Sequence, residues 1–324
     1  MKVAILGATG AVGQMMLRVL EERGFPADEV VLLASERSAG RRLPWRGREW
    51  PVVEPTPEAF EGCALALFSA GATRSREWAP VAAEAGAVVV DNSSAWRMDP
   101  DVPLVVPEVN PERVRERPRG IIANPNCVTI QLVLALEGIR RAGGLRRVVV
   151  STYQAVSGAG AKGMDALRAE LAGGESAVSP FVAPIAGNVI PAIGDRDPAG
   201  WTEEEAKIRN ETRKILGLPG LPVAATCVRV PVEVGHSVAA TVETERPLDL
   251  ETARAALEAM PGVAVDDGTP PMPREVAGGD VVRVGRLRRD PDLDHVLHFW
   301  VVGDNLRKGA ATNTVQIAEL LLGG

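Results

Sequence analysis

The residue best suited to nucleophilic chemistry is Cys127, which follows an Asn-Pro-Asn turn and precedes an apolar stretch that predicts a helix. A thiol at a helix N-terminus ionises readily because the helix dipole stabilises the thiolate. The neighbouring backbone N–H groups, including that of Val128, could bind an oxyanion. The other two cysteines, Cys63 and Cys227, lie in apolar strand-like sequence and are expected to be small buried side chains.

A thiol nucleophile needs a partner that handles protons, and the chain has three histidines. His236 follows Gly235 between two strand-like stretches, a position that suits a partly exposed acid or base. Position alone leaves a structural role for His236 equally open. His295 and His298 share one strand-like stretch and are expected to be structural. No Cys or His spacing resembles a metal site, so no metal is expected.

A second candidate site is the sequence GATGAVG at 7–13, between a predicted strand and a predicted helix. Its spacing is GxxGxxG rather than the GxGxxG usual for dinucleotide folds. A helix N-terminus offers N–H groups and a partial positive charge to a pyrophosphate. The alternative is a glycine-rich turn that binds nothing. The residues expected to contact a dinucleotide are Gly7, Thr9, Gly10, Ala11, Val12 and Gly13.

The second predicted strand is followed by Ser35, Glu36, Arg37 and Ser38. NAD enzymes usually place an acid here to bind the ribose hydroxyls. Arg and Ser can instead bind a 2′-phosphate by charge-assisted hydrogen bonds. We therefore expect NADP rather than NAD, held by Ser35, Arg37 and Ser38, although these residue types would also suit a plain surface loop.

The elements that position the glycine turn alternate between strand and helix. The hydrophobic pattern predicts strands over 2–6, 29–34, 64–69 and 87–91, and helices over 11–23 and 75–85. This alternation predicts a Rossmann-like, doubly wound parallel sheet.

The pattern changes at Cys127. Predicted strands at 146–154, 224–233, 237–245 and 295–303 are β-branched and alternating, which favours a mixed or antiparallel sheet. Helices are predicted after Cys127 and over 202–216, and the apolar segment 308–322 is expected to pack back onto the chain. We therefore expect an α/β protein with an NADP-binding domain over 1–126, to which helix 306–324 returns. An α+β catalytic and dimerisation domain is expected over 127–305.

Composition restricts the class of protein. The chain has 324 residues, 46% hydrophobic and 24% charged, with a net charge of −6. It has no long basic run, so no nucleic-acid partner is expected. It has no apolar stretch of roughly 18 residues, so no membrane partner is expected. The N-terminal stretch is better explained as strand, turn and helix than as a signal peptide, and we expect a cytoplasmic protein.

Taken together, the motifs resemble those of the aspartate-β-semialdehyde dehydrogenase family over nearly the whole chain. The ordered set is GATGAVG at 7–13, ASERSAG at 34–40, DNSSAWRMD at 91–99, NPNC at 124–127, YQAVSGAG at 153–160, EEEAKIRNET at 203–212, RVPVEVGHS at 229–237 and DNLRKGAATN at 304–313. One departure is Val128, since the family often has a small polar residue after the cysteine.

The resemblance implies a role for each matching residue. Cys127 would be the nucleophile, His236 the acid/base and Gln154 the side chain that orients the reacting carbonyl. Arg229 would bind the substrate α-carboxylate and Glu204 the α-amino group. Arg97 and Lys207 would hold the phosphate, whereas Ser157, Gly158 and Asn305 would approach the nicotinamide.

The resemblance further implies NADPH-dependent reduction of L-4-aspartyl phosphate to L-aspartate-4-semialdehyde through a thioester, with release of inorganic phosphate, by a homodimer. Two alternatives remain open. One is a related reductase acting on N-acetylglutamyl phosphate or malonyl-CoA, for which Glu204 and Arg229 are the discriminating residues. The other is a catalytically silent paralogue, against which the presence of Cys127 and His236 argues.

Overall fold

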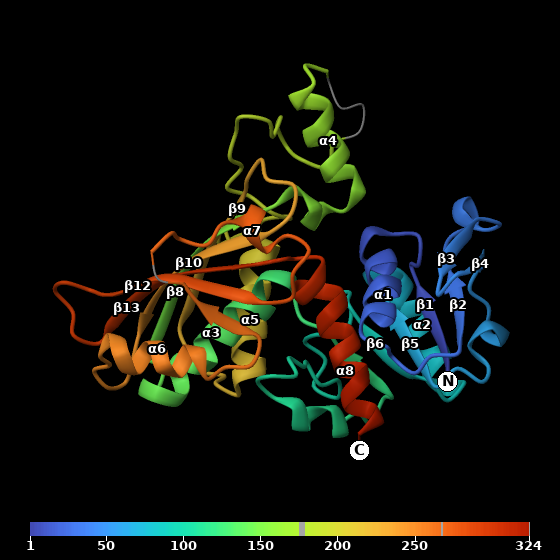
Figure 1. Ribbon diagram of the computed structural model, residues 1–324, viewed down its shortest axis with the longest axis horizontal. Helices are drawn as coiled ribbons and strands as arrows, with labels where there is room; N and C mark the ends of the chain where they lie inside the picture. Colours follow the sequence, from blue (N-terminus) through green and yellow to red (C-terminus); the bar gives the residue numbers. More distant parts are fainter. Residues whose placement is uncertain (175–178, 267, 324) are drawn as a thin grey trace. The chain divides into compact units, whose positions relative to one another are not determined.

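The computed structural model describes residues 1–174, 179–266 and 268–323. The chain divides into two compact units (Figure 1). Unit 1 comprises residues 1–125 with 310–324, and unit 2 comprises residues 126–309. The first break lies one residue before the expected boundary at 126/127, and the second lies four residues after the expected one at 305/306.

Unit 1 contains a seven-stranded sheet in the order β3-β4-β2-β1-β5-β6-β7. Five of its strands form a continuous parallel sheet, namely β1 (Lys2–Leu6), β2 (Glu29–Leu33), β5 (Leu65–Phe68), β6 (Val88–Asp91) and β7 (Ile121–Ala123). Its helices are α1 (Ala11–Glu22), α2 (Ala72–Glu84) and α8 (Thr312–Leu322). The predicted strand–turn–helix sequence at the start of the chain and the doubly wound parallel sheet are confirmed.

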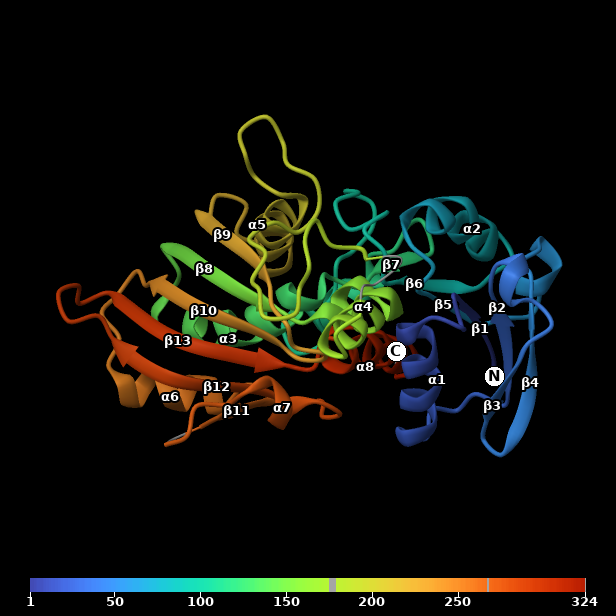
Figure 2. The same ribbon diagram turned by 90° about the horizontal axis from the view of Figure 1, so that it is seen from above.

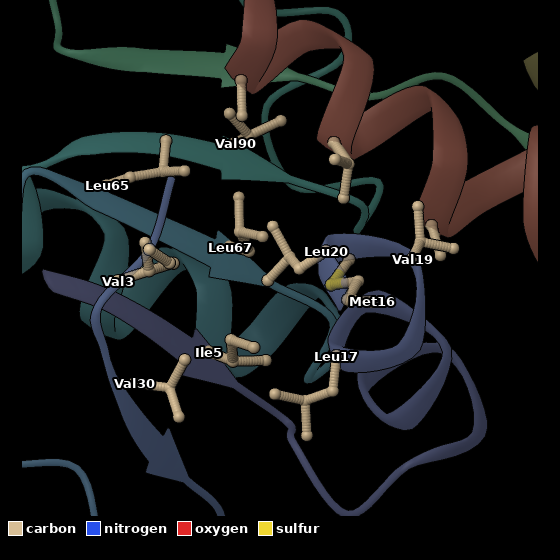
Figure 3. Close-up of a cluster of buried hydrophobic side chains, with 14 of the residues drawn as sticks. Val3, Ile5, Met16, Leu17, Val19, Leu20, Val30, Leu65, Leu67 and Val90 are labelled. Carbon is tan, nitrogen blue, oxygen red and sulfur yellow. The ribbon is translucent and has the colours of Figure 1, made fainter. Parts of the chain in front are cut away.

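The core of unit 1 forms where apolar strand residues meet the apolar face of α1 (Figure 3). Val3, Ile5 and Leu67 lie in this cluster with Met16 and Leu20, and all are fully buried. The spacing of Met16, Leu17, Val19 and Leu20 places them on one helical face. Burial of this face fixes where α1 begins, and therefore where the glycine turn lies relative to the sheet.

The sequence did not predict the edge of this sheet. β3 (Arg42–Trp45) and β4 (Arg48–Val53) form an antiparallel hairpin, and β4 pairs in parallel with β2. The hairpin turns at Arg46 and Gly47, both with positive φ. Its strands contain prolines and charged residues, which weaken the strand signal and suit an edge position.

Unit 2 contains a six-stranded mixed sheet in the order β11-β12-β13-β10-β8-β9. Its strands are β8 (Arg147–Gln154), β9 (Val223–Arg229), β10 (His236–Glu243), β11 (Val263–Val265), β12 (Val282–Arg289) and β13 (Val296–Gly303). β8 and β9 are parallel, whereas β10 is antiparallel to both β8 and β13. The predicted mixed sheet is confirmed. The predicted strand 224–233 instead ends at Arg229, because Pro231 has no N–H to continue the ladder.

Helices cover one face of this second sheet. α3 (Cys127–Gly143) and α6 (Leu250–Glu258) lie on that face, and α5 (Glu203–Leu216) packs against β9 and α3. Figure 2 shows the opposite face of β8, β10, β12 and β13 turned towards the viewer with no helix across it. The segment with α4 (Ala161–Leu171) and the short α7 (Pro273–Val276) complete the unit. None of the helices within the described residues is long and apolar enough to cross a membrane.

Candidate active site

Cys127 is the first residue of α3 and is half-buried. The preceding residue, Asn126, caps the helix: its side-chain oxygen accepts from the N–H groups of Val128 at 3.0 Å and Thr129 at 3.3 Å. The Val128 N–H, which was expected to be available to an oxyanion, donates within the protein in this arrangement.

Two buried carboxylates of α5 hold Asn126 in place. Glu211 accepts from the Asn126 backbone N–H at 2.6 Å, and Glu204 accepts from its side-chain amide at 2.8 Å. Both carboxylates are less than a tenth exposed. The backbone N–H and the side-chain amide of Asn126 are thus both hydrogen-bonded to α5. These two bonds fix the backbone immediately before Cys127.

Strand pairing gathers three further predicted site residues. Gln154 ends β8 and is in register with Arg229, which ends the parallel strand β9. His236 begins β10, whose second residue, Ser237, pairs with Tyr153 of β8. The carboxyl ends of two strands and the start of a third therefore meet at one end of the sheet, which brings Gln154, Arg229 and His236 together. The Gln154 amide donates to Thr152 Oγ1 at 3.2 Å.

The backbone of Ala155 connects two of these side chains. Its N–H donates to Nδ1 of His236 at 3.0 Å, and its carbonyl accepts from Nη1 of Arg229 at 2.7 Å. Sequence reasoning did not identify Ala155, because its contribution comes from the main chain and its residue type gives no signal.

His236 differs from the expectation of partial exposure: the side chain is completely buried. Burial, and secondly the positive charge of Arg229, hold the pKa of His236 well below its ordinary value of 6.5. The imidazole is therefore neutral in the folded protein near neutral pH. Its Nε2 has no hydrogen-bond partner within the described part of the chain.

Arg229 is buried as well, and its guanidinium lies 5.9 Å from the centre of the Phe181 ring. Burial lowers the pKa of Arg229, and the negative charges of Glu204 and Cys127 partly oppose this effect. Arg229 and Glu204 thus provide a positive and a negative group within electrostatic range of each other. Such a pair suits the carboxylate and ammonium groups of an amino acid.

The predicted nicotinamide-side residues lie in the same part of unit 2. Ser157 and Asn305 hydrogen-bond through their side chains at 2.9 Å, and Asn305 also accepts from the Gly235 N–H at 2.9 Å. A Cβ atom at Gly158 would lie 2.7 Å from Nη1 of Arg229 and 3.2 Å from Nε2 of His236. The missing side chain at Gly158 therefore leaves space beside both groups.

Helix α3 is tied to this cluster one turn beyond Cys127. Gln131, at the i+4 position, donates to the His236 carbonyl at 3.0 Å. Residues four apart share a helix face, so Cys127 lies on the face that meets the start of β10. Gly309 also packs closely against Cys127, since a Cβ at Gly309 would lie 3.1 Å from Cβ of Cys127.

In unit 1 the glycine turn has the geometry that a pyrophosphate requires. Gly7 has φ of +89°, and a Cβ there would lie 2.5 Å from the Ser69 carbonyl oxygen. A Cβ at Gly13 would lie 2.2 Å from the Gly7 carbonyl oxygen. Gly10 caps α1 without a side-chain hydrogen bond, so the N–H groups of Ala11 and Val12 in the first turn have no capping side chain. The residues present fit a dinucleotide phosphate at this helix N-terminus.

The predicted 2′-phosphate residues lie beside this turn. Glu36–Ser38 form a single 3-10 turn after β2, and Ser35, Glu36 and Arg37 are exposed. The Thr9 hydroxyl donates to Ser38 Oγ at 3.3 Å. Unit 1 thus brings Thr9 and the segment 35–38 together.

The two predicted phosphate-binding residues belong to different units. In unit 1, Arg97 is buried and donates to the backbone carbonyls of Asn92 at 2.7 Å and Asn124 at 3.0 Å. In unit 2, Lys207 on α5 lies 3.5 Å from Glu204 and 3.8 Å from Glu203. Arg97 therefore also fixes the chain leading to the nucleophile.

Sequence reasoning missed a set of hydrogen-bonded polar side chains in unit 1, of which Asn124, Asn313 and Thr314 are buried and Asn92 is half-buried. Asn124 bonds to Asn92 at 2.8 Å and to Asn313 at 2.7 Å, and Asn92 also bonds to Thr314 at 2.7 Å. These residues lie in or beside the motifs DNSSAWRMD, NPNC and DNLRKGAATN, so the motifs contained the signal.

The remaining candidates have structural environments. Cys63 and Cys227 are buried, and burial raises the pKa of the Cys227 thiol to about 12. His298 bonds to Asp290 and Thr241 within the sheet of unit 2. Within the described residues, no group of three or more His, Cys, Asp or Glu side chains could hold a metal ion.

Comparison with known proteins agrees with this arrangement. Residues 2–117 match the family model "Semialdehyde dehydrogenase, NAD binding domain", and residues 136–308 match "Semialdehyde dehydrogenase, dimerisation domain". The aspartate-semialdehyde dehydrogenase of Aquifex aeolicus is 54% identical, over 99% of this chain and 98% of the relative.

Solved structures agree as well. That of aspartate semialdehyde dehydrogenase II from Vibrio cholerae, complexed with ASA, has a TM-score of 0.96 and 49% identity, covering 99% of this chain and 98% of that one. The Candida albicans aspartate semialdehyde dehydrogenase with NADP has a TM-score of 0.77 and 28% identity, covering 99% of this chain and 98% of that one. The chain therefore has a nicotinamide-dinucleotide-binding domain and a dimerisation domain, and it belongs to the aspartate-semialdehyde dehydrogenase family of oxidoreductases.

Proposed function

We propose that the protein reduces L-4-aspartyl phosphate to L-aspartate-4-semialdehyde with NADPH through a thioester on Cys127, and catalyses the phosphate-dependent oxidation of the aldehyde in reverse. The observation that carries this proposal is the position of Cys127 at the start of α3, held by Asn126, in the same unit as the Arg229–Glu204 pair. The names of the relatives support the substrate assignment.

Arg229 and Glu204 would select the substrate. The guanidinium would bind the α-carboxylate as a fork, and the Glu204 carboxylate would accept from the α-ammonium group. An N-acetylated amino group carries no positive charge, so Glu204 disfavours N-acetylglutamyl phosphate. Fixing this end of the substrate brings its acyl carbon close to the thiol.

Cys127 would form and release the covalent bond. Its thiolate attacks the acyl carbon and phosphate leaves, with Arg97 and Lys207 proposed to stabilise the charge on the phosphate. Gln154 would orient the reacting carbonyl. NADPH, when bound, supplies the hydride that reduces the thioester. The glycine turn 7–13 would hold its pyrophosphate, and Ser157, Gly158 and Asn305 would contact the nicotinamide end.

The preference for NADP rests on Ser35, Arg37 and Ser38, which provide a cation and two hydroxyls after β2. The Candida albicans relative, whose structure contains NADP, supports it.

A homodimer is part of the proposal, because residues 136–308 match a dimerisation domain. We propose that the helix-free face of the unit 2 sheet makes the contact. Along β8, Val148, Val150 and Thr152 are buried, whereas Val149 and Ser151 are half-buried and Tyr153 is exposed. The Tyr153 ring lies 5.3 Å from that of Trp300 on the same face. Aromatic side chains of this kind are enriched in interface cores.

The assay follows NADPH formation from L-aspartate-4-semialdehyde, NADP and phosphate, for wild type and Cys127→Ser. Activity that requires phosphate and falls by on the order of 10³-fold or more in the variant supports the thioester mechanism. An inactive wild type would overturn the substrate assignment, and N-acetylglutamate semialdehyde is then the next substrate. Equal activity of wild type and variant would exclude Cys127 as the nucleophile.

A further inference from the structure

The segment 181–190 contacts Arg229 at both of its ends. At its start, the centre of the Phe181 ring lies 5.9 Å from the guanidinium carbon of Arg229. At its end, Ile190 and Arg229 exchange two backbone hydrogen bonds as an antiparallel bridge, at 2.9 Å and 2.8 Å. One short stretch of chain therefore holds the main chain of Arg229 and also lies against its side chain.

A small hydrophobic cluster holds this segment in place. The buried members of the cluster are Val156, Leu167, Ile185 and Ile190. The Phe181 side chain is half-buried and packs against them. Val156 directly follows Ala155, whose carbonyl accepts from Nη1 of Arg229 at 2.7 Å. The cluster thus fixes Phe181 to the same piece of backbone that orients the guanidinium.

A carboxylate on α4 adds a second attachment. Glu170 accepts from the backbone N–H groups of Ile185 at 2.6 Å and Ala186 at 2.7 Å. Hydrogen bonds to an ionised acceptor are about twice as strong as those between neutral groups. The segment lies outside the helices and strands, yet it is tied to α4 by charge and by apolar packing.

Gly163, in the first turn of α4, makes room for the Phe181 ring. A Cβ at Gly163 would lie 3.2 Å from Cζ of Phe181 and 2.3 Å from the Val156 carbonyl oxygen. The tip of the ring therefore lies against bare backbone, while its centre is within cation–π distance of Arg229. Both contacts together set the position of the ring.

The same stretch of chain continues to the other proposed substrate-binding residue. The Ile193 carbonyl accepts from the Glu204 N–H at 3.4 Å, and the Asp195 carbonyl accepts from the Glu203 N–H at 2.9 Å. Residues 181–204 therefore run from the guanidinium of Arg229 to the start of α5, where Glu204 lies. A single segment connects the groups proposed to bind the two charges of the substrate.

The position of Phe181 determines how much water reaches Arg229, whose residue is 6% exposed. A cation screened from water attracts a carboxylate more strongly, because solvent neither screens the charge nor competes for its N–H groups. The negative face of an aromatic ring also offsets part of the cost of burying a cation. Phenylalanine has no ionisable or hydrogen-bonding side-chain group, so it cannot transfer a proton or bind the phosphate itself.

We propose that Phe181 is a positioning residue for the substrate α-carboxylate: its ring covers Arg229, excludes water from the guanidinium and so increases the affinity for an aldehyde that carries a free carboxylate. The proposal rests on the proposed function for the identity of this carboxylate, but the cover over Arg229 does not depend on the substrate. The carboxylate contact is the same in the ground state and the transition state, so its loss raises KM and leaves kcat unchanged.

The first test measures the cover without any substrate. Full-length wild type, Phe181→Ala and Val182→Ala are treated with phenylglyoxal, and the modification of Arg229 is followed by mass spectrometry relative to Arg18, whose side chain is 69% exposed. Arg229 should react several-fold faster in Phe181→Ala, and at the wild-type rate in Val182→Ala, because Val182 is 84% exposed. Equal rates for wild type and Phe181→Ala would overturn the proposal.

The second test measures kinetics with L-aspartate-4-semialdehyde, NADP and phosphate. Phe181→Leu is added, since leucine keeps an apolar side chain in the cluster and removes only the ring. Both Phe181 variants should raise the KM for the aldehyde about 5–30-fold, as for loss of a desolvated cation–π contact, with kcat within about twofold of wild type. Val182→Ala should match wild type.

An unchanged KM in Phe181→Leu would overturn the role of the ring. A loss of kcat as large as the loss of kcat/KM would also contradict it, because a merely structural defect acts on both. An inactive wild type would overturn the proposed function, whereas the phenylglyoxal rates would still decide whether Phe181 covers Arg229.

Discussion

In unit 2, single backbone groups and the missing side chain of Gly158 position the candidate site residues Arg229 and His236. The N–H of Ala155 donates to Nδ1 of His236, its carbonyl accepts from Arg229, and the bare Cα of Gly158 leaves room beside both side chains. None of these contributions needs a reactive side chain. The reactive residues depend on them because a misplacement of about 1 Å can reduce the rate about 100-fold.

Gly158→Ala tests the space beside His236 and Arg229. The added methyl would lie 2.7 Å from Arg229 and 3.2 Å from His236, so one of them must move. We expect kcat/KM to fall about 10²-fold with the fold retained. Gly220→Ala is the control, because its Cβ would meet nothing within 4 Å. Equal kinetics for the two variants would show that the space is not needed.

Arg229→Lys tests the guanidinium fork. Lysine keeps the charge but cannot bind a carboxylate with two parallel hydrogen bonds while donating to Ala155. We expect the KM for L-aspartate-4-semialdehyde to rise about 10–100-fold, as for loss of a charged hydrogen bond. An unchanged KM would remove Arg229 from substrate binding.

The buried neutral His236 also predicts a pH dependence of stability. Its folded-state pKa is well below 6.5, so only the unfolded chain takes up this proton as the pH falls through 6.5. The contribution of the neutral His236 to the free energy of unfolding is therefore present above pH 6.5. It is lost as the pH falls below 6.5, by up to about 1.4 kcal/mol per pH unit. Urea unfolding between pH 5 and 8 should give a steeper loss at low pH for wild type than for His236→Asn. Parallel curves would contradict the shifted pKa.

At the level of elements, the residue that caps α3 both stabilises this helix and positions the proposed nucleophile, Cys127. Asn126 caps the helix and donates to the carboxylates of Glu204 and Glu211 on α5, which fixes the backbone before Cys127. The cap of α6, Asp249, also accepts from the third helical N–H, that of Thr252 at 2.8 Å, but it lies on an exposed surface.

The two caps provide a matched comparison. Asn126→Ala and Asp249→Ala should each lower the free energy of unfolding, by about 1 kcal/mol for a typical cap. The Asn126 variant should lose more, because Glu204 and Glu211 pack against it, and only this variant should lose activity. If both variants lost activity equally, Asn126 would affect activity only by stabilising the fold. Thermal unfolding and the phosphate-dependent assay together separate these cases.

At the scale of the whole molecule, unit 2 exposes one face of its sheet (Figure 2). Helices α3 and α6 cover the other face, whereas this face carries the exposed Tyr153 beside the half-buried Trp300, whose Nε1 donates to the Pro271 carbonyl at 3.0 Å. Antiparallel and mixed sheets can leave one face to solvent, but exposed aromatic patches commonly mark an interface.

Trp300→Glu tests this face as the dimer contact. A buried charge without a partner strongly weakens an interface, so the variant should elute as a monomer in size-exclusion chromatography with light scattering, whereas wild type elutes as a dimer. Val53→Glu, at a 42% exposed position in unit 1, is the control and should remain dimeric. A dimeric Trp300 variant would place the interface elsewhere.

Much of unit 1 could be read from the sequence because its signals are local. A five-residue apolar strand, a glycine turn and a helix with one apolar face lie consecutively, so neighbouring residues alone specify the βα unit and its phosphate-binding turn. The hairpin β3–β4 escaped prediction because its prolines and charges oppose the usual strand pattern, and pairing with β2 stabilises it.

By itself, the sequence determined the fold class and the chemical types at Cys127, Arg229, Glu204 and His236, because residue identity and periodicity carry that information. Only the tertiary structure decided which atoms those residues use. Pairing of β8, β9 and β10 buried His236 and turned its Nδ1 to Ala155, and packing of α5 directed Glu204 and Glu211 to Asn126. Hydrogen-bond direction and burial depend on residues far apart in the chain, and no local pattern encodes them.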